Sequence, residues 1–269
     1  MKKKTTVVLP IMLLIGLSLL LYPTVSNYWN NLHQSKAIAG YKETVSSMDK
    51  TEYDKIWDEV VEYNQNINRL NISAITDAER REYYRLLDIT GTGIMGYIEI
   101  PDINCTLPIY HGTSDSVLQV ATGHIEGSSL PVGGEGSHCV ISGHRGLPSA
   151  RLFTNLDQLN EGDFFILSVL DEKLTYKVDQ ISVVLPEDVS QLTFEDGMDL
   201  CTLVTCTPYG VNSHRLLVRG HRVPNETVEI MRVSSEAVQI QRMWVTVAVC
   251  IPLVLIWLVF IIIRRKLRG

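Results

Sequence analysis

The sequence has few cysteines and no pattern of cysteine and histidine that would organise a fold around them. The five cysteines are an odd number, which does not suit a disulfide framework. His138, Cys139 and His144 lie close together, but neighbours on a strand face opposite ways and no second group of ligands follows. We therefore expect no disulfide-stapled domain, no metal site and no cofactor.

Positive charge is also scarce outside the two ends of the chain. Of the 24 Lys and Arg residues, seven lie at the ends, so residues 5–263 combine 17 basic with 30 acidic side chains. An acidic surface of this kind repels nucleic acid and anionic lipid and suits a cationic amine, although it also simply keeps a domain soluble. Nucleic acid is therefore not an expected partner.

Both ends of the chain have the composition of membrane segments. Three lysines precede a mostly apolar stretch up to Tyr22, and the next residues, Pro23 to Ser26, do not form the small-x-small pattern of a signal-peptide cleavage site. We expect an uncleaved anchor over residues 1–25, with a cleaved signal peptide as the alternative. Met243 to Ile263 is an uncharged run of 21 residues, enough at about 1.5 Å per residue to cross a bilayer core of about 30 Å. Because both tips of the chain are basic, we expect both termini in the cytoplasm and the middle outside the plasma membrane.

The stretch from Thr202 to Gly220 combines a nucleophile with a positive charge. TLVTC reads as a short buried strand that ends at Cys206, because Pro208 and Gly210 force a turn. A second strand starts near Arg215, so a hairpin of this length returns the guanidinium to the side of the thiol. A nearby positive charge lowers the pKa of a thiol and makes it a better nucleophile.

A base for this thiol is available upstream. In HCVISGHRG, a strand through Ile141 is broken at Gly143, which places His144 at its tip. Imidazole is the side chain best matched to proton transfer near neutral pH. Cys206, His144 and Arg215 are therefore the candidate catalytic residues.

TLVTC, GHRG and the nine-residue spacing from Cys206 to Arg215 resemble the sortases, in particular the pilus-building class C group, over about Gly96–Gly220. The resemblance implies a membrane-anchored cysteine transpeptidase of a Gram-positive cell surface, acting on pilins or surface proteins. Cys206 would attack the threonine carbonyl of a Leu-Pro-x-Thr-Gly-like (LPXTG-like) sorting signal to give a thioester, and His144 would move the protons. Arg215 would bind the carbonyl oxygen or hold the substrate backbone, and Thr205 would add a donor. A pilin lysine amine would then resolve the thioester, so that subunits are joined by isopeptide bonds.

The region from Gly96 onward consists of short strands punctuated by turns. Parallel β/α units need helices of ten or more residues, and only Ala150 to Leu159 suggests even a short one. We therefore expect a mainly β domain built as a closed antiparallel barrel, and the resemblance implies eight strands. The predicted parts are an anchor at 1–25, a helical region at 26–90, a barrel at 91–225, a connector at 226–242, a transmembrane helix at 243–263 and a basic tail at 264–269.

The helical region begins with residues 27–38, which read as a stalk or as the start of a helix. Asp49 precedes an amphipathic helical pattern, and Thr76 with Glu79 forms a capping box for a second helix, expected to reach Leu87 before two glycines stop it. Class C sortases carry a lid in this region, a loop with Asp-Pro and an aromatic residue that plugs the active site. This sequence has no Asp-Pro-aromatic motif, so autoinhibition by such a lid is not predicted.

Less specific readings remain for single residues. Cys206 is by itself a typical core cysteine and His144 a typical loop histidine, and only the surrounding motifs favour catalytic roles. Arg219 lies four residues after Arg215 on the same strand face, so the choice of Arg215 depends on the family spacing. His124 is expected to be structural or to line the substrate site.

The other cysteines are expected to be structural. Cys201 lies five positions before Cys206, so it points to the opposite face and into the core. Cys105 and Cys139 can pair only if the fold brings their Cα atoms within about 7 Å. Cys250 is a small apolar residue in the middle of the C-terminal membrane segment.

Three other functions are compatible with these motifs. One is a sortase that attaches surface proteins to a cell-wall precursor, and the second is a hydrolytic cysteine protease of the same geometry. The third is a non-catalytic membrane scaffold that binds pilins. The C-terminal membrane segment and the long N-terminal helical region favour the pilin-polymerising group.

Overall fold

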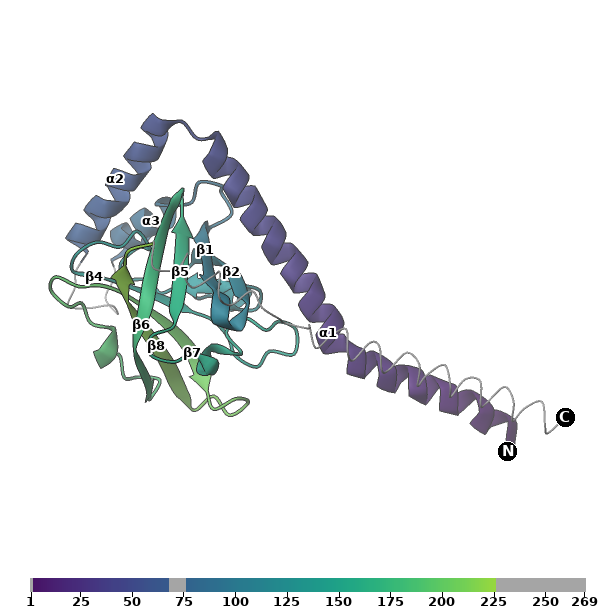
Figure 1. Cartoon of the computed structure of the whole chain (residues 1–269). Helices are drawn as coiled ribbons and strands as arrows, with labels where there is room; N and C mark the ends of the chain where they lie inside the picture. Colours follow the sequence, from purple (N-terminus) through teal and green to yellow (C-terminus); the bar gives the residue numbers. More distant parts are fainter. Residues whose placement is uncertain (1, 68–75, 226–269) are drawn as a thin grey trace. The chain divides into compact units, whose positions relative to one another are not determined.

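In the computed structural model, the described part of the chain comprises residues 2–67 and 76–225 (Figure 1). The chain forms two compact units, residues 1–225 and 226–269, and everything described belongs to the first. The predicted connector, transmembrane helix at 243–263 and basic tail lie outside the described residues.

Three helices precede the barrel: α1 (Lys2–Ser47), α2 (Lys50–Asn66) and α3 (Asp77–Arg85). α1 runs through the expected anchor and the following polar stretch without a break, so the reading of residues 27–38 as the start of a helix is confirmed. Residues 27–38 therefore continue the helix of the expected anchor.

Both predicted caps are confirmed. The Asp49 side chain accepts a hydrogen bond from the N–H of Glu52 at 2.9 Å, and Thr76 forms the capping box with Glu79. The helix that follows Thr76 is shorter than expected, because the chain leaves the helical conformation directly after Arg85 and Leu87 is left-handed with φ 63°. The helix therefore ends before it reaches Gly91 and Gly93.

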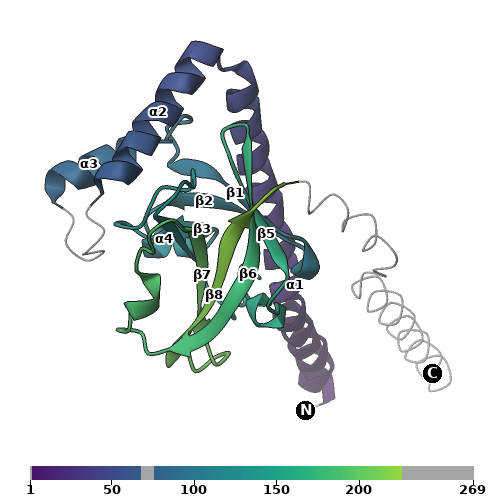
Figure 2. The same ribbon diagram turned by 60° about the vertical axis from the view of Figure 1, so that its left-hand side comes forward.

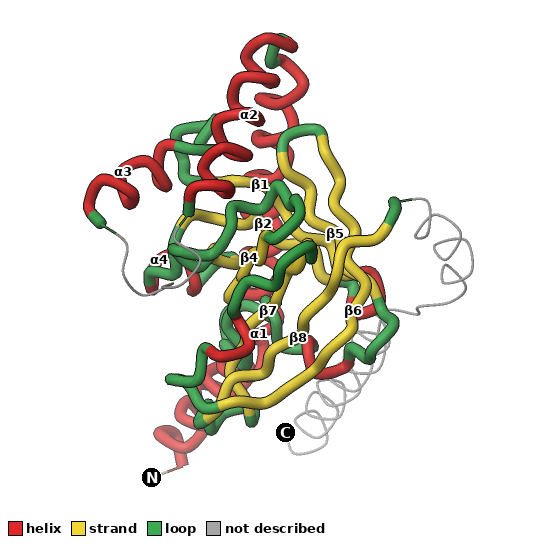
Figure 3. The backbone as a smooth tube through the Cα atoms, turned by 90° about the vertical axis from the view of Figure 1, so that its left-hand side faces the viewer, coloured by secondary structure: helices red, strands yellow, loops and turns green. Residues whose placement is uncertain are grey.

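Eight strands form a closed barrel in the order β1-β2-β3-β4-β7-β8-β6-β5 (Figure 3). They are β1 (Ile94–Ile100), β2 (Cys105–His111), β3 (Thr122–His124), β4 (Ser137–Ser142), β5 (Phe164–Val169), β6 (Glu172–Val184), β7 (Asp199–Thr207) and β8 (His214–Val223). The mainly β, closed eight-stranded fold is thus confirmed. The prediction of an antiparallel barrel is wrong, because β2 pairs with β3 and β4 pairs with β7 in parallel.

Both parallel pairs form without the long helices that the prediction required. The β2–β3 connection contains only α4 (Asp115–Leu118), and the path from β4 to β7 passes through β5 and β6 on the far part of the closed sheet. Barrel closure here replaces a helical crossover as the means of bringing parallel strands together. The short helix suggested at 150–159 is one 3-10 turn, η2 (Leu156–Gln158), and two further turns are η1 (Pro101–Ile103) and η3 (Ser190–Leu192).

One hydrophobic core joins the barrel interior to α2 and α3. Its buried members include Val60 of α2, Tyr83 of α3, and Ile98 and Phe165 of the barrel. Burying a large apolar side chain stabilises a fold by about 1.5–3 kcal/mol, so the two helices are integral parts of the domain. Figure 2 shows β7, β8 and β6 side by side on the part of the barrel that carries the candidate site.

α1 packs separately against the outside of β1 and β2. Tyr41 is 1% exposed, and its hydroxyl donates to the carbonyl of Met95 at 2.8 Å and accepts from the N–H of Leu170 at 2.7 Å. Ile38 packs with it against β1. The second half of α1 is therefore fixed to the barrel.

Candidate active site

Cys206 lies near the end of β7 with Arg215 directly opposite it. The two residues are paired in the antiparallel register of β7 and β8. Side chains of directly opposed residues project from the same face of a sheet, so the predicted nucleophile and guanidinium are neighbours. The hairpin between the two strands has the length that the sequence indicated.

His144 reaches the same end of the barrel from the other side of β7. The last paired residues of β4 and β7 are Ser142 and Val204, in parallel register. Beyond them, the N–H of Gly143 donates to the Val204 carbonyl at 3.0 Å, and the Thr205 hydroxyl donates to the Gly143 carbonyl at 2.7 Å. His144 is the next residue after Gly143, as Cys206 is the next after Thr205. The structure therefore brings the three strand ends together, with the Cys206 strand in the middle.

The glycines of GHRG allow close packing around His144. A Cβ added to Gly143 would lie 2.6 Å from Cδ2 of Phe153, and the Phe153 N–H donates to the His144 carbonyl at 3.1 Å. Gly146 has φ +80°, and a Cβ there would lie 3.0 Å from the ring of Tyr209 in the β7–β8 loop. At Gly143 a buried ring already occupies the space of a side chain, and at Gly146 the positive φ disfavours one.

Arg145 is a structural member of the site that the sequence analysis did not single out. Its side chain is only 9% exposed, forms an ion pair with Asp157 and donates from Nη1 to the Thr207 hydroxyl at 3.2 Å. Its Nε has no hydrogen-bond partner among the described residues. The guanidinium ties the residue after His144 to the residue after Cys206. The feature of the sequence that could have indicated this role is the charged residue inside the GHRG motif.

Arg215 and Arg219 of β8 differ in their partners. Arg219 is held by carboxylates, with Nε 3.0 Å from Asp179 and Nη1 2.8 Å from Glu195. Among the described residues Arg215 has no carboxylate partner, and its Nη1 donates to the carbonyls of its neighbours Asn212 and His214 at 3.3 and 3.1 Å. Arg215 is therefore available to bind a ligand, whereas Arg219 is already held by two carboxylates.

The donor role suggested for Thr205 does not fit its hydroxyl. Thr205 is 1% exposed, and its hydroxyl donates to the main chain beside His144. It holds the β4 end against β7 instead.

The four described cysteines are all free thiols; Cys139 and Cys201 are buried, whereas Cys105 and Cys206 are partly exposed. Cys201 is 0% exposed, which confirms its predicted place in the core, and it is paired in register with buried Cys139. Burial raises the pKa of the Cys105 thiol to about 12, and its sulfur contacts the Leu152 carbonyl at 3.7 Å. Cys206 is partly exposed and has Arg215 opposite it, so it is the described cysteine best placed to react.

Two buried histidines have structural partners. His124 is 0% exposed, with Nδ1 3.0 Å from the Tyr83 hydroxyl and Nε2 2.8 Å from the Ser129 carbonyl, which supports the structural reading of this residue. His138 contacts the Thr193 carbonyl and the Thr202 hydroxyl, and desolvation by burial lowers its pKa. Within residues 2–67 and 76–225, no group of three His, Cys, Asp or Glu side chains is arranged to hold a metal ion.

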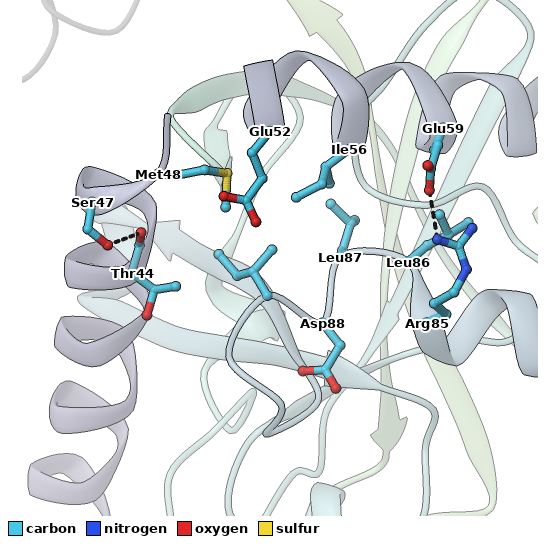
Figure 4. A pocket seen from close by; sticks show the side chains of 11 residues that line it. Thr44, Ser47, Met48, Glu52, Ile56, Glu59, Arg85, Leu86, Leu87 and Asp88 are labelled. Carbon is cyan, nitrogen blue, oxygen red and sulfur yellow. Dashed lines mark hydrogen bonds and ion pairs between the residues drawn. The ribbon is translucent and has the colours of Figure 1, made fainter. Parts of the chain in front are cut away.

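A separate pocket lies between the C-terminal end of α1, α2 and the chain that follows α3 (Figure 4). Its lining includes Thr44, Glu52, Leu87 and the ion pair between Glu59 and Arg85. None of the three candidate catalytic residues lines it. The pocket therefore belongs to the helical region and not to the candidate active site.

Comparisons with known proteins agree with this arrangement. A family model described as a sortase domain matches residues 98–223. The crystal structure of sortase C1 from Streptococcus agalactiae is 54% identical, with a TM-score of 0.69 over 71% of this chain and 99% of that chain. Sortase C from Streptococcus pneumoniae, whose structure is described as informative on pilin substrate specificity, is 47% identical, with a TM-score of 0.65 over 70% of this chain and 97% of that chain.

A more distant relative is sortase D of Bacillus subtilis (strain 168). It is 32% identical over 131 residues, which cover 48% of this chain and 63%, less than two thirds, of that protein. This chain belongs to the sortase family, whose members are cysteine transpeptidases, and its likeness to solved sortase C structures places it in class C.

Proposed function

We propose that this chain is a membrane-anchored sortase that cleaves an LPXTG-like sorting signal and joins pilin subunits through isopeptide bonds to a lysine amine. The observation that carries the proposal is the register around Cys206, with Arg215 opposite it on β8 and the end of the His144 strand beside it on β4. The pilin specificity associated with the Streptococcus pneumoniae relative supports pilins as the substrate class.

The proposed reaction has two halves. Sγ of Cys206 bonds to the threonine carbonyl carbon, the threonine–glycine amide bond breaks, and His144 delivers a proton to the departing amine. A lysine amine then attacks the thioester, His144 accepts its proton, and the thiolate leaves as the new amide forms. Arg215 binds the carbonyl oxygen as it gains negative charge in both halves, a role supported by the absence of a carboxylate partner in the described part of the chain.

α1 supports the proposed anchoring. The part from Met12 onward contains a window of mean hydropathy 1.2, none of which is buried inside the protein. Exposed apolar residues over such a length need an apolar solvent, and a bilayer core of about 30 Å matches a helix of about 20 residues. A tethered enzyme meets tethered substrates at a high local concentration.

The test is a mass spectrum of the full chain after incubation with an LPXTG-like peptide. We expect an acyl adduct on Cys206, none with Cys206→Ala, and an unchanged adduct with the control Cys105→Ala. With purified pilin, we expect a ladder of covalent multimers.

Other outcomes identify the competing functions. Single attachment to an amine of the cell-wall precursor type, without multimers, indicates the wall-attaching sortase. Release of free acid at a rate independent of added amine indicates a protease. Covalent pilin assembly that survives Cys206→Ala indicates a scaffold and contradicts the proposal.

A further inference from the structure

The barrel has one end that carries the candidate active site and one that does not. The first, here the site end, holds Cys206, Arg215 and the start of the β4–β5 loop at Gly143. The second, here the far end, holds the β5–β6 turn at Leu170. α1 contacts both ends, and these contacts establish which end lies nearer the N-terminus of the helix.

At the site end, two asparagines of α1 bind the main chain of the β4–β5 loop. Oδ1 of Asn27 accepts from the N–H of Arg151 at 3.0 Å, and Nδ2 of Asn30 donates to the Ser149 carbonyl at 2.8 Å. This loop begins at Gly143 and includes His144. The anchor helix and the candidate base are therefore joined through a few residues of one loop.

At the far end, the contact is made by Tyr41, whose hydroxyl binds the main chain of Met95 and Leu170. Tyr41 lies 14 residues after Asn27 in the same helix, or about 21 Å along its axis at about 1.5 Å per residue. The barrel thus lies along α1 with its site end toward the N-terminal half of the helix, the half that is predicted to enter the membrane (Figure 1).

The position of the bilayer along α1 follows from charge and length. Lys2 to Lys4 stay on the cytoplasmic side, and about 20 residues after them span the hydrocarbon core, which ends near Thr24. Asn27 then lies about 4.5 Å beyond the core, inside a headgroup layer about 5–7 Å thick. Tyr28 and Trp29, 66% and 61% exposed, are in the same turn, and these residue types favour that layer.

The β7–β8 loop adds two exposed apolar side chains at the site end. Tyr209 is 60% exposed and Val211 is 70% exposed. The Tyr209 ring contacts Gly146 of the β4–β5 loop, which is itself held by α1 at the headgroup level. Aromatic and aliphatic side chains at the tip of a loop, continuous with a membrane anchor, suit an interfacial position.

We propose that the site end of the barrel faces the bilayer that holds α1, with Tyr209 and Val211 in the lipid headgroup layer. This inference rests on the anchoring proposed for α1. It specifies the substrate further: the peptide that reacts with Cys206 reaches it at the membrane surface. A peptide held far above the bilayer meets the far end of the barrel instead.

Fluorescence quenching in lipid vesicles tests the orientation. The four tryptophans of the full chain are replaced by phenylalanine, and a single reporter is introduced by Val211→Trp. The matched control is Asp171→Trp, an exposed position in the β5–β6 turn at the far end. A third chain keeps only Trp29. The vesicles contain phosphatidylcholine brominated near the glycerol end of its acyl chains.

We expect quenching of the Val211→Trp and Trp29 reporters and none of the Asp171→Trp reporter. The more conservative Tyr209→Trp reporter gives the same result if Val211→Trp does not fold. Quenching of Trp29 without quenching of either loop reporter refutes the orientation and leaves the anchoring intact. A blue-shifted but unquenched Val211→Trp reporter also refutes it, because protein and not lipid then covers the loop.

Absence of quenching in the Trp29 chain removes the anchoring and this inference together. The Cys206 adduct is measured separately on a soluble peptide, so transpeptidation is judged independently of either result.

Discussion

Gly143→Ala should damage both the stability of this protein and its active site. The new Cβ would lie 2.6 Å from Cδ2 and 2.9 Å from Cγ of Phe153, about 1 Å closer than carbon atoms normally approach. Neither partner can move away easily. Gly143 is hydrogen-bonded to Val204 and Thr205 of β7, and Phe153 is 0% exposed with its N–H bonded to the His144 carbonyl.

The expected loss of stability follows from the lack of space around Gly143. Overpacking a filled core costs about 1–3 kcal/mol, and we expect the free energy of unfolding to fall by that amount. Part of the strain should displace His144 relative to Cys206, and a displacement of about 1 Å reduces a reaction rate by as much as about 10²-fold. The acylation rate of Gly143→Ala should therefore fall more than its stability alone explains.

Two measurements check this expectation: urea unfolding of the full chain in detergent, and single-turnover acylation of Cys206 by a sorting peptide. The control is Gly40→Ala in α1, where an added Cβ meets nothing within 4 Å and helix propensity should slightly stabilise the protein. In the double variant with Phe153→Leu, the second substitution should cost less than it does alone, because the smaller side chain relieves the clash. A Gly143→Ala protein with unchanged stability and unchanged acylation would refute the reasoning.

Three further predictions concern other parts of the structure. Tyr41→Phe removes the hydroxyl that binds the Met95 carbonyl and the Leu170 N–H, and it should lower the free energy of unfolding in urea by about 1–3 kcal/mol. The control Tyr28→Phe should leave the free energy of unfolding unchanged, because that side chain is 66% exposed. Burial lowers the pKa of His138, so the unfolded chain binds the proton more readily; stability should decrease as the pH falls below about 6.5, and His138→Gln should flatten that decrease in melting temperature. Arg215→Lys should slow acylation of Cys206 by about 10²-fold in a stopped assay, while Arg219→Lys changes it little; equal effects would contradict the choice of Arg215.

The sequence predicts local features of this fold well because they depend on near neighbours. The Asp49 cap, the Thr76 capping box and the β7–β8 hairpin each involve residues within about a dozen positions of one another. Cys206 and Arg215 could therefore be paired from spacing alone. The same holds for the β strands that carry them, whose apolar and β-branched residues alternate with the period of the sheet.

The direction in which distant strands pair could not be predicted from the sequence. The antiparallel prediction failed because the parallel pairing of β4 with β7 joins Cys139 to Cys201, residues 62 positions apart with two strands between them. Nothing in either segment encodes that direction, which closure of the barrel imposes. The three-residue strand β3 is too short to show a period, so the sequence pattern alone does not reveal it.

The hydrogen-bond and ion-pair partners of the side chains at the site could not be predicted from the sequence either. Arg145 was passed over beside His144, and its importance appears only when Asp157 and Thr207 are seen around it. The engagement of Arg219 by two carboxylates, which favours Arg215 as the free guanidinium, likewise depends on β6 and the loop that follows it. The family spacing favoured Arg215 but supplied no physical reason for that choice.

The place of β8 in the barrel has a consequence for how the protein is made. Of the strands in the described part of the chain, β8 is the last to be synthesised, and it pairs with both β7 and β6. Until it emerges, the nascent chain holds Cys206 with no guanidinium opposite and leaves two strand edges open to other chains. Translation order thus brings Arg215 opposite Cys206 only when this strand is available, and a polypeptide that stops before His214 should be prone to aggregation.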